Sequence, residues 1–288
     1  MKNQDILGYP CAMTIAGSDS GGGAGIQADL RTFNAFGVFG CSAITALTAQ
    51  NPLEVTQIEA VSAGMVGAQI DAVLSKICVG SIKTGMLFSA EIIRMVAEKL
   101  QNSHRMLVVD PVMVSTSGSR LLQADAVEVL KNELLPLADW ITPNIPEAEL
   151  LLNRSLRSVS DYQAAAVELA ESYGCGVLLK TGHAASVNGK MVDIVAVDGQ
   201  LFELGAPEVE LPCPAAGHGT GCTLSSALAA CLALEMELDE ALTACKGFVY
   251  GSLLESVELG GDLYGMYPPQ ESYEAKTFLR PVKTKKGR

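Results

Sequence analysis

The segment Gly217–Thr223, which reads GHGTGCT, holds the residue types in this chain that are best suited to chemistry. Its three glycines allow a tight turn onto the small and apolar run Leu224–Leu234, a pattern that predicts a helix start. The first free N–H groups of a helix bind anions, and the helix dipole lowers the pKa of a thiol in the first turn, where Cys222 stands. The same pattern also fits a glycine turn that only packs a buried helix.

Short apolar runs that end in glycine or polar residues recur along the chain and are typical of buried strands. These runs are Ala12–Ala16, Cys41–Ala49, Ser81–Thr84, Met106–Val109, Trp140–Thr142 and Gly176–Leu179. Segments with helical spacing are 26–36, 66–77, 90–100, 124–134, 145–152, 161–173 and about 219–234 and 239–259. Alternating strands and helices predict parallel βαβ units with helices on both faces of one sheet. We therefore expect an α/β protein with three layers, α/β/α, and a mostly parallel central sheet.

Residues 191–211 follow a different pattern, in which β-branched and polar residues alternate around Asp198-Gly199. An Asp-Gly pair between two such runs predicts a β-hairpin. No Ser/Gly-rich linker, internal repeat or low-complexity tract divides the sequence. A single domain follows from this continuity.

In an open parallel sheet, ligands bind at the carboxyl ends of the strands, so the residues after each apolar run are the candidates for a site. The segments that follow the runs are Gly17–Gly25, Gln50-Asn51, Lys83–Met86, Asp110-Pro111, Pro143–Glu147 and Lys180–His183. All of them would meet at one edge of the sheet. Strand ends are polar in many proteins, so for any single residue a purely structural role stays open.

Composition excludes several classes of protein. Of the 288 residues, 49% are hydrophobic and 18% charged, which indicates a substantial buried core. The net charge is −12 and basic residues are dense only in the tail after Pro281, so nucleic acid is not an expected partner. The eight cysteines form no CxxC pair and no zinc-spaced cluster with histidine, which favours reduced thiols. Without a signal peptide or a long apolar run, we expect a cytoplasmic protein with no membrane partner.

The glycine-rich loops do not match the common nucleotide-binding patterns. The GxGxxG pattern fails from Gly21 and from Gly217, and the variant that starts at Gly23 lacks a downstream acidic residue to bind a ribose. A P-loop is also absent, because Gly189-Lys190 is followed by Met191. If this protein binds phosphate, it does so with other elements.

Six segments occur in an order typical of one family. They are AGSDSGGGAGIQAD (16–29), TALTAQN (45–51), KTGML (83–87), DPVM (110–113), TPNIPEAE (142–149) and GHGTGCT (217–223). The chain resembles, from about residue 11 to residue 258, the hydroxymethylpyrimidine/phosphomethylpyrimidine kinases of thiamine biosynthesis, which belong to the ribokinase-like superfamily. The resemblance implies one ribokinase-like kinase domain over 11–260, a flexible N-terminus over 1–10 and a C-terminal extension over 261–288 of unknown role. It also implies a homodimer.

The resemblance implies ATP and Mg²⁺ as cofactors and assigns residues to phosphoryl transfer. The catalytic residues would be Gly219 and Gly221 of the anion site, Lys180, and Cys222, which stands where most ribokinase-like enzymes have an aspartate base. ATP and its phosphates would contact Asp110, Asn144, Lys180, Thr220 and Gly221, and Mg²⁺ would bind Asp110 and Glu147, partly through water. Several of these residues also have a purely structural alternative. Asn144 and Glu147 fit a helix capping box. Lys180 fits a structural ion pair, and Cys222 fits an inert residue in a tight turn.

The pyrimidine substrate would contact the residues that match Gly17, Asp29, Gln50 and Met86. An aminopyrimidine places a ring nitrogen acceptor beside an amine donor, a pattern that an amide or carboxylate can pair with, while a methionine can pack on the ring. Related pyridoxal kinases tend to lack this glutamine, so Gln50 favours a pyrimidine substrate. Asp29 also fits a solvated helix residue, and Met86 a core residue.

Three other functions compete with the pyrimidine kinase. A pyridoxal/pyridoxine kinase of the same family is the first. A cysteine hydrolase or transferase would use Cys222 as nucleophile with His183 or His218 as base, but it leaves the acidic residues and Lys180 without a purpose. A non-catalytic protein that binds a pyrimidine or a phosphorylated ligand would be expected to have lost Cys222, Glu147 or Lys180, and all three are present. The sequence leaves open whether one or both phosphorylation steps occur.

Overall fold

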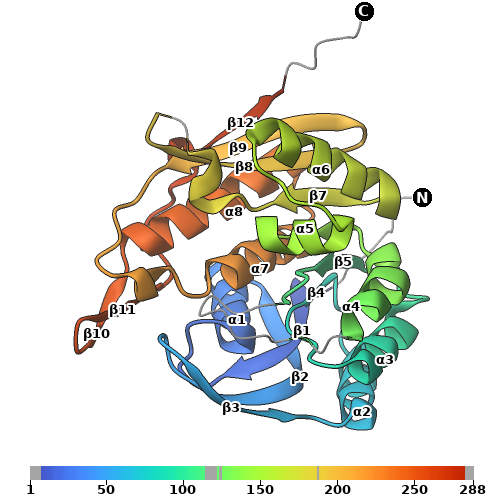
Figure 1. Cartoon of the computed structure of the whole chain (residues 1–288). Coiled ribbons are helices and arrows are strands. Elements are labelled where there is room, and N and C mark those ends of the chain that lie inside the picture. Colours follow the sequence, from blue (N-terminus) through green and yellow to red (C-terminus); the bar gives the residue numbers. More distant parts are fainter. Residues whose placement is uncertain (1–7, 114–121, 123–124, 187, 283–288) are drawn as a thin grey trace, which may run out of the picture.

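The structure, a computed structural model, describes residues 8–113, 122, 125–186 and 188–282, so most of the predicted flexible N-terminus lies outside it (Figure 1). Within these residues the main sheet has ten strands in the order β12-β9-β8-β7-β6-β5-β4-β1-β2-β3. The strands are β1 Cys11–Asp19, β2 Phe39–Gln50, β3 Val55–Ala60, β4 Ser81–Thr84, β5 Met106–Val109, β6 Trp140–Ile141, β7 Gly176–Leu179, β8 Lys190–Val197, β9 Gln200–Pro207 and β12 Phe278–Pro281.

The centre of the sheet, from β7 across to β2, is parallel. The outer strands β3, β8, β9 and β12 each pair antiparallel with a neighbour. Parallel neighbours need crossover connections, and helices supply them. The helices are α1 Gly25–Ala35, α2 Ala63–Leu74, α3 Ala90–Leu100, α4 Ala126–Val129, α5 Ile145–Leu152, α6 Val159–Tyr173, α7 Thr220–Ala233 and α8 Leu238–Leu254.

Helices cover both faces of the sheet, because successive side chains of a strand point to opposite faces. On one face, Ala12 and Leu178 pack with buried side chains of α1, α7 and α8. On the other face, their neighbours Met13 and Leu179 pack with α2 to α6. The predicted three-layer α/β/α fold with a mostly parallel central sheet is confirmed, and the helices are visible on both sides of the sheet in Figure 1.

Most predicted elements lie where the sequence placed them. Strands β4, β5 and β7 and helices α3 and α5 have the predicted bounds. The predicted helix over 124–134 is different, because α4 ends at Val129 and a π-helical turn, Leu130–Leu134, continues it. The predicted hairpin is β8–β9, and its turn residues Asp198 and Gly199 have φ angles of 51° and 70°, as an Asp-Gly hairpin turn requires.

Some elements had no signal in the apolar runs. Strand β3 pairs with β2 and has mostly exposed side chains, so no apolar run marks it. The helix predicted to end at about residue 259 ends at Leu254 instead, and a small antiparallel pair, β10 Val257–Gly260 and β11 Leu263–Gly265, follows it. Strand β12 pairs with β9. The segment after residue 260, to which the sequence assigned no role, therefore supplies one of the two edge strands of the main sheet.

Short 3-10 helices complete the described chain, namely Leu135–Leu137, Gly182–Ala185, Pro214–Gly217 and Glu274–Lys276. Across the described ranges, none of the helices combines the length and apolar character needed to cross a membrane. The parallel strands all end at one edge of the sheet, and α7 begins there as well. This edge holds the residues that the sequence singled out.

Candidate active site

A cavity of about 420 Å³ opens at the carboxyl edge of the parallel strands. Nearly all of the predicted site residues line it: Gly17, Gln50, Met86, Asp110, Asn144, Glu147, Lys180, Gly219, Thr220, Gly221 and Cys222. They come from the ends of β1, β2 and β7, from the loops after β4 and β5, and from the starts of α5 and α7. The fold thus brings together segments that are up to about two hundred residues apart in sequence.

The start of α7 forms one wall of this cavity. Gly219 precedes the helix with a φ of 87°, and a Cβ atom at this position would overlap the carbonyl oxygen of Gly23. Only glycine combines this backbone angle with so close an approach of the two glycine-rich loops. Gly219 provides no side-chain cap, so the first N–H groups of the 14-residue helix stay available. Since Thr220, Gly221 and Cys222 line the cavity, this wall is suited to an anion.

Cys222 lies in the first turn of α7, but its thiol does not have the lowered pKa that we expected. Burial raises the pKa of the Cys222 thiol, and the carboxylates of Asp29 and Asp110 act in the same direction. The ammonium of Lys83 and the backbone N–H of Gly25 lower it, without outweighing burial. The expectation of a thiolate at the helix start is therefore wrong for the free protein, because enclosure disfavours the charged form.

Lys180 and Asp110, which both line the cavity, form an ion pair. Nζ of Lys180 lies 2.7 Å from Oδ1 of Asp110, and both side chains are largely buried. Thr142 and Ser225 each donate a hydrogen bond of 3.2 Å to the same carboxylate. Burial acts to raise the pKa of Asp110, but the nearby Lys180 and Lys83 ammonium groups outweigh it and hold the pKa below its usual range.

The Lys180 ammonium also lies beside the anion site. A Cβ atom added at Gly221 would be 3.1 Å from Nζ of Lys180, so a side chain there would crowd this amine. The structural ion pair and a contact to phosphate are therefore compatible, since an ammonium group has three donors. The structural ion pair of Lys180 is therefore present, and the contact of its ammonium group with phosphate stays a prediction.

Asn144 and Glu147 form a capping box at the start of α5. Oδ1 of Asn144 accepts from the Glu147 N–H at 2.9 Å, and Oε2 of Glu147 accepts from the Asn144 N–H at 2.8 Å. Burial raises the pKa of the Glu147 carboxyl to about 7, while Lys180 lowers it and Asp110 raises it. A buried carboxyl whose charge is so poorly compensated fits a nearby cation, and its oxygen chemistry suits Mg²⁺.

Asp29 does not lie where the resemblance implied. Its side chain is fully buried beneath the cavity and contacts none of the open space. Both carboxylate oxygens bind Nζ of Lys83, at 2.9 and 3.0 Å, and Thr14 donates a third hydrogen bond at 2.6 Å. Ser226 of α7 donates a further short hydrogen bond. The direct substrate contact predicted for Asp29 is thus corrected, because these partners already occupy the carboxylate, and the alternative of a solvated helix residue is wrong as well.

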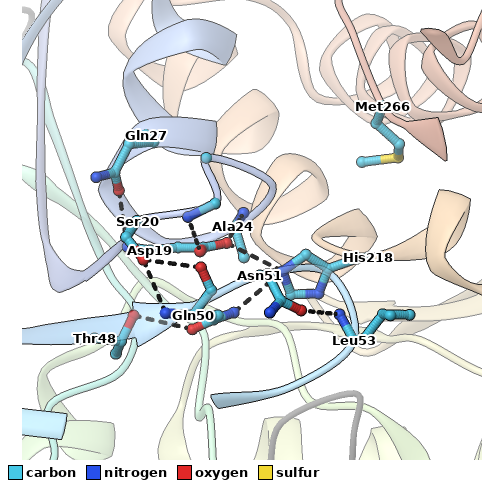
Figure 2. Close-up of polar contacts among 12 residues, drawn as sticks. Asp19, Ser20, Ala24, Gln27, Thr48, Gln50, Asn51, Leu53, His218 and Met266 are labelled. Carbon is cyan, nitrogen blue, oxygen red and sulfur yellow. Dashed lines mark hydrogen bonds and ion pairs between the residues drawn. The ribbon is translucent and has the colours of Figure 1, made fainter. Parts of the chain in front are cut away.

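Gln50, Met86 and Gly17 line the same cavity as Lys180. Met86 is buried but lines the cavity, and a Cβ atom at Gly17 would overlap its terminal methyl group. The Gln50 amide lies between Thr48 and His218, as Figure 2 shows. These contacts leave the amide at the cavity wall, where it can meet a ligand.

A smaller cavity of about 120 Å³ adjoins the anion site on its other side. It shares Lys180, Thr220 and Gly221 with the main cavity. The rest of its lining is mainly apolar and includes Met191, Val209, Leu224, Val249 and Leu253. A flat apolar group joined to phosphates at the start of α7 would fit this arrangement.

Sequence reasoning underrated three side chains at the site, namely Asp19, Lys83 and His218. Each stands in a segment that the sequence singled out, yet its importance comes from a partner far along the chain, such as His218 for Asp19. The Cys222 nucleophile hypothesis gains no geometric support, since the described contacts of the His218 side chain are with Asp19 and Gln50. The side chain of His183 lies outside the described part of the chain.

Comparisons with known proteins show the family of this chain. A family model described as phosphomethylpyrimidine kinase matches residues 19–267. A hydroxymethylpyrimidine/phosphomethylpyrimidine kinase of Rhizobium meliloti (strain 1021) is 46% identical over 253 residues, which is 86% of this chain and 93% of that protein.

Two kinds of solved structure are also similar. A phosphomethylpyrimidine kinase from Clostridium difficile 630 is 41% identical, with a TM-score of 0.72 over 83% of this chain and 97% of that chain. A pyridoxal kinase from Staphylococcus aureus, in complex with pyridoxal, is 29% identical, with a TM-score of 0.84 over 96% of this chain and 100% of that chain. The pyrimidine kinase is nearer in sequence, and the pyridoxal kinase is nearer in overall shape.

Proposed function

This chain belongs to the phosphomethylpyrimidine kinase family, and from that premise we propose how its cavity binds and phosphorylates the substrate. Its function is that of a hydroxymethylpyrimidine/phosphomethylpyrimidine kinase in thiamine biosynthesis, with ATP as the phosphoryl donor. The observation that best supports the proposal is the uncapped start of α7, which faces the same cavity as Lys180, Cys222 and Gln50.

The phosphates of ATP lie between the start of α7 and Lys180. Phosphoryl transfer needs charge stabilisation around the transferred group and an in-line hydroxyl, with little covalent work by the protein. The N–H groups of Gly221 and Cys222 supply donors in fixed positions, and the Lys180 ammonium supplies a positive charge beside them. The adenine ring occupies the smaller apolar cavity, which shares these phosphate-binding residues.

Cys222 faces the hydroxymethyl group of the substrate. As a neutral thiol it positions the hydroxyl, and in the fraction of molecules in which the thiol has lost its proton to water, the thiolate accepts the hydroxyl proton. Replacing it by alanine is expected to lower the turnover of hydroxymethylpyrimidine by at least about a hundredfold, the smaller end of the range for general base catalysis. A Cys222→Ala protein with nearly unchanged kcat would remove this assignment.

Mg²⁺ binds near Asp110 and Glu147, partly through water molecules. Mg²⁺ held there would supply positive charge beside the phosphates, which Lys180 and the start of α7 would hold in place. Titration of the ATP-bound protein with Mn²⁺, followed by its paramagnetic effect on water, should show a site that Glu147→Gln weakens. Turnover that persists in the presence of excess chelator would contradict a metal-dependent kinase.

Gln50 and Met86 bind the pyrimidine, with the amide facing the amine and ring nitrogen and the thioether packed on the ring. Pyridoxal is the second candidate substrate, because the overall shape is so similar to a pyridoxal kinase. The deciding experiment compares turnover of hydroxymethylpyrimidine, its monophosphate and pyridoxal under matched conditions. It also shows whether one or both phosphorylation steps occur.

The Gln50→Met variant tests the basis of this specificity. We expect it to weaken the use of the pyrimidine more than the use of pyridoxal, because only the pyrimidine places an amine donor beside a ring nitrogen acceptor. Equal losses on both substrates would defeat the argument.

A homodimer and a cytoplasmic location are the remaining parts of the proposal, and both rest on the sequence. Light scattering after size-exclusion chromatography tests the first. A monomer at micromolar concentration would contradict it.

A further inference from the structure

Three polar side chains meet at the rim of the main cavity, namely Asp19, Gln50 and His218 (Figure 2). Nε2 of His218 lies 3.1 Å from Oδ2 of Asp19 and 3.2 Å from Nε2 of Gln50. At the other end of the amide, Oε1 of Gln50 lies 3.1 Å from Oγ1 of Thr48. The orientation of the Gln50 amide decides where a ligand meets a hydrogen-bond donor and where it meets an acceptor.

Asp19 determines the protonation of the histidine nitrogen that faces it. Its carboxylate already accepts hydrogen bonds of 2.8 Å from the N–H groups of Gly21 and Ala24. Burial acts to raise the pKa of Asp19, but these hydrogen bonds and the one with His218 outweigh it, so the pKa lies below its usual range. A carboxylate only accepts, so Nε2 of His218 must be protonated in the neutral and in the charged ring alike.

The amide as placed then faces two mismatched neighbours. Nε2 of His218 carries a single proton, which Asp19 accepts, so this nitrogen has no lone pair to offer the amino group of Gln50, which is itself a donor. Thr48 has a single hydroxyl proton, and the carbonyl oxygen of Ser18, at 2.8 Å, is its nearer acceptor. The lone pairs of Thr48 therefore face the carbonyl oxygen of Gln50, which is also an acceptor.

A half-turn of the amide exchanges its two ends with almost no change of shape and removes both mismatches. We propose that His218, oriented by Asp19, holds Gln50 in this turned orientation and is thereby a specificity-determining residue for the pyrimidine. The carbonyl oxygen of Gln50 then shares the single Nε2 proton of His218 with Asp19, in a three-centre hydrogen bond. Its amino group donates to Thr48, whose own proton stays on the carbonyl oxygen of Ser18.

The turned amide offers its remaining lone pair and its second N–H to the ligand in a fixed order. An aminopyrimidine matches that order with its amine at the carbonyl end and its ring nitrogen at the amino end. Because the order is fixed, the pyrimidine is accepted in one edge-on orientation. This inference rests on the proposed contact between Gln50 and the pyrimidine.

The test compares KM values at saturating ATP for His218→Leu, His218→Gln and a control, His104→Leu, which changes an exposed histidine in the loop after α3. We expect His218→Leu to raise the KM for hydroxymethylpyrimidine about tenfold, as for the loss of a well-oriented hydrogen bond. His218→Gln can place an N–H donor near the same point and should recover most of this loss. The control should match the unaltered protein.

Combining His218→Leu with Gln50→Met separates orientation of the amide from a direct contact of His218 with the ligand. If His218 acts through the amide, its replacement adds little once Gln50 is gone. Full additivity, or an unchanged KM in His218→Leu, overturns the inference. Failure of the unaltered protein to phosphorylate any pyrimidine would instead refute the proposed function.

A spectroscopic measurement covers the case in which the variants do not fold. In the unaltered protein with ¹⁵N-labelled histidine, long-range ¹H–¹⁵N correlations report which ring nitrogen is protonated. We expect the proton on Nε2 of His218 at neutral pH. An unprotonated Nε2 overturns the inference.

Discussion

The buried pair of Lys83 and Asp29 allows a prediction whose size follows from the structure. Neither side chain is exposed, and the Lys83 ammonium binds both carboxylate oxygens at 2.9 and 3.0 Å. Removing one partner of such a pair costs about 3–5 kcal/mol, because the other charge is left in an interior that solvates it poorly. In Lys83→Met the carboxylate keeps its hydrogen bonds from Thr14 and Ser226, so we expect the lower end of this range.

The assay is equilibrium unfolding of the ligand-free protein in urea, supported by thermal scans. A loss of about 3 kcal/mol corresponds to a fall in Tm of roughly 6–12 °C for a domain of this order of size. The double variant Lys83→Met/Asp29→Asn should be more stable than Lys83→Met alone, because it leaves no unpaired charge. Lys99→Met is the matched control. Its exposed ion pair with Asp71 is expected to contribute less than about 1 kcal/mol.

Lys83→Met should also change the chemistry of Cys222. The Lys83 ammonium lowers the pKa of this thiol, so its removal should slow alkylation of Cys222 at a fixed pH of about 8. A loss below about 1 kcal/mol in Lys83→Met, or a double variant that loses the sum of both single changes, would refute the reasoning.

Three further changes test other parts of the site. Gly219→Ala should lower kcat at least about tenfold, because the added Cβ atom overlaps the Gly23 carbonyl oxygen and the backbone angle adds a left-handed strain of about 1–2 kcal/mol. Gly37→Ala is the control: its φ is 70° and no atom is close, so it should show the strain alone, as a loss of stability. Alkylation of Cys222 by iodoacetamide can be followed site by site with mass spectrometry. Because burial raises the pKa of the thiol, the alkylation rate should keep rising as the pH passes the ordinary thiol pKa of 9.0. A rate that reaches a plateau below pH 8 would contradict this. Arg31→Ala should raise the KM for the pyrimidine. Arg31 donates hydrogen bonds to the carbonyl oxygens of Gly22 and Met266 and so connects the glycine-rich loop to the C-terminal segment. An unchanged KM would show that the loop keeps its shape without Arg31.

Local patterns in the sequence determined the order of strands and helices and the edge of the sheet where the site lies. Apolar runs and helical spacing are properties of neighbouring residues, which explains why β4, β5, β7, α3 and α5 have the predicted bounds. The glycine turn before α7 and the capping box at α5 are also local, since each depends on residue types a few positions apart. Strand β3 escaped prediction because its side chains are mostly exposed and leave no apolar run.

Only the tertiary structure decided what each polar residue of the site binds. Asp29 and Lys83 are 54 residues apart, and Asp19 and His218 are 199 apart, so no pattern within one segment reveals either pair. Burial likewise depends on the whole packed chain, and it reverses the direction expected for the Cys222 pKa. The sequence by itself determined which residues reach the cavity edge, because strand ends and helix starts are encoded locally. Their pairing and charge were decided by packing, because hydrogen bonds and desolvation are set by neighbours in space.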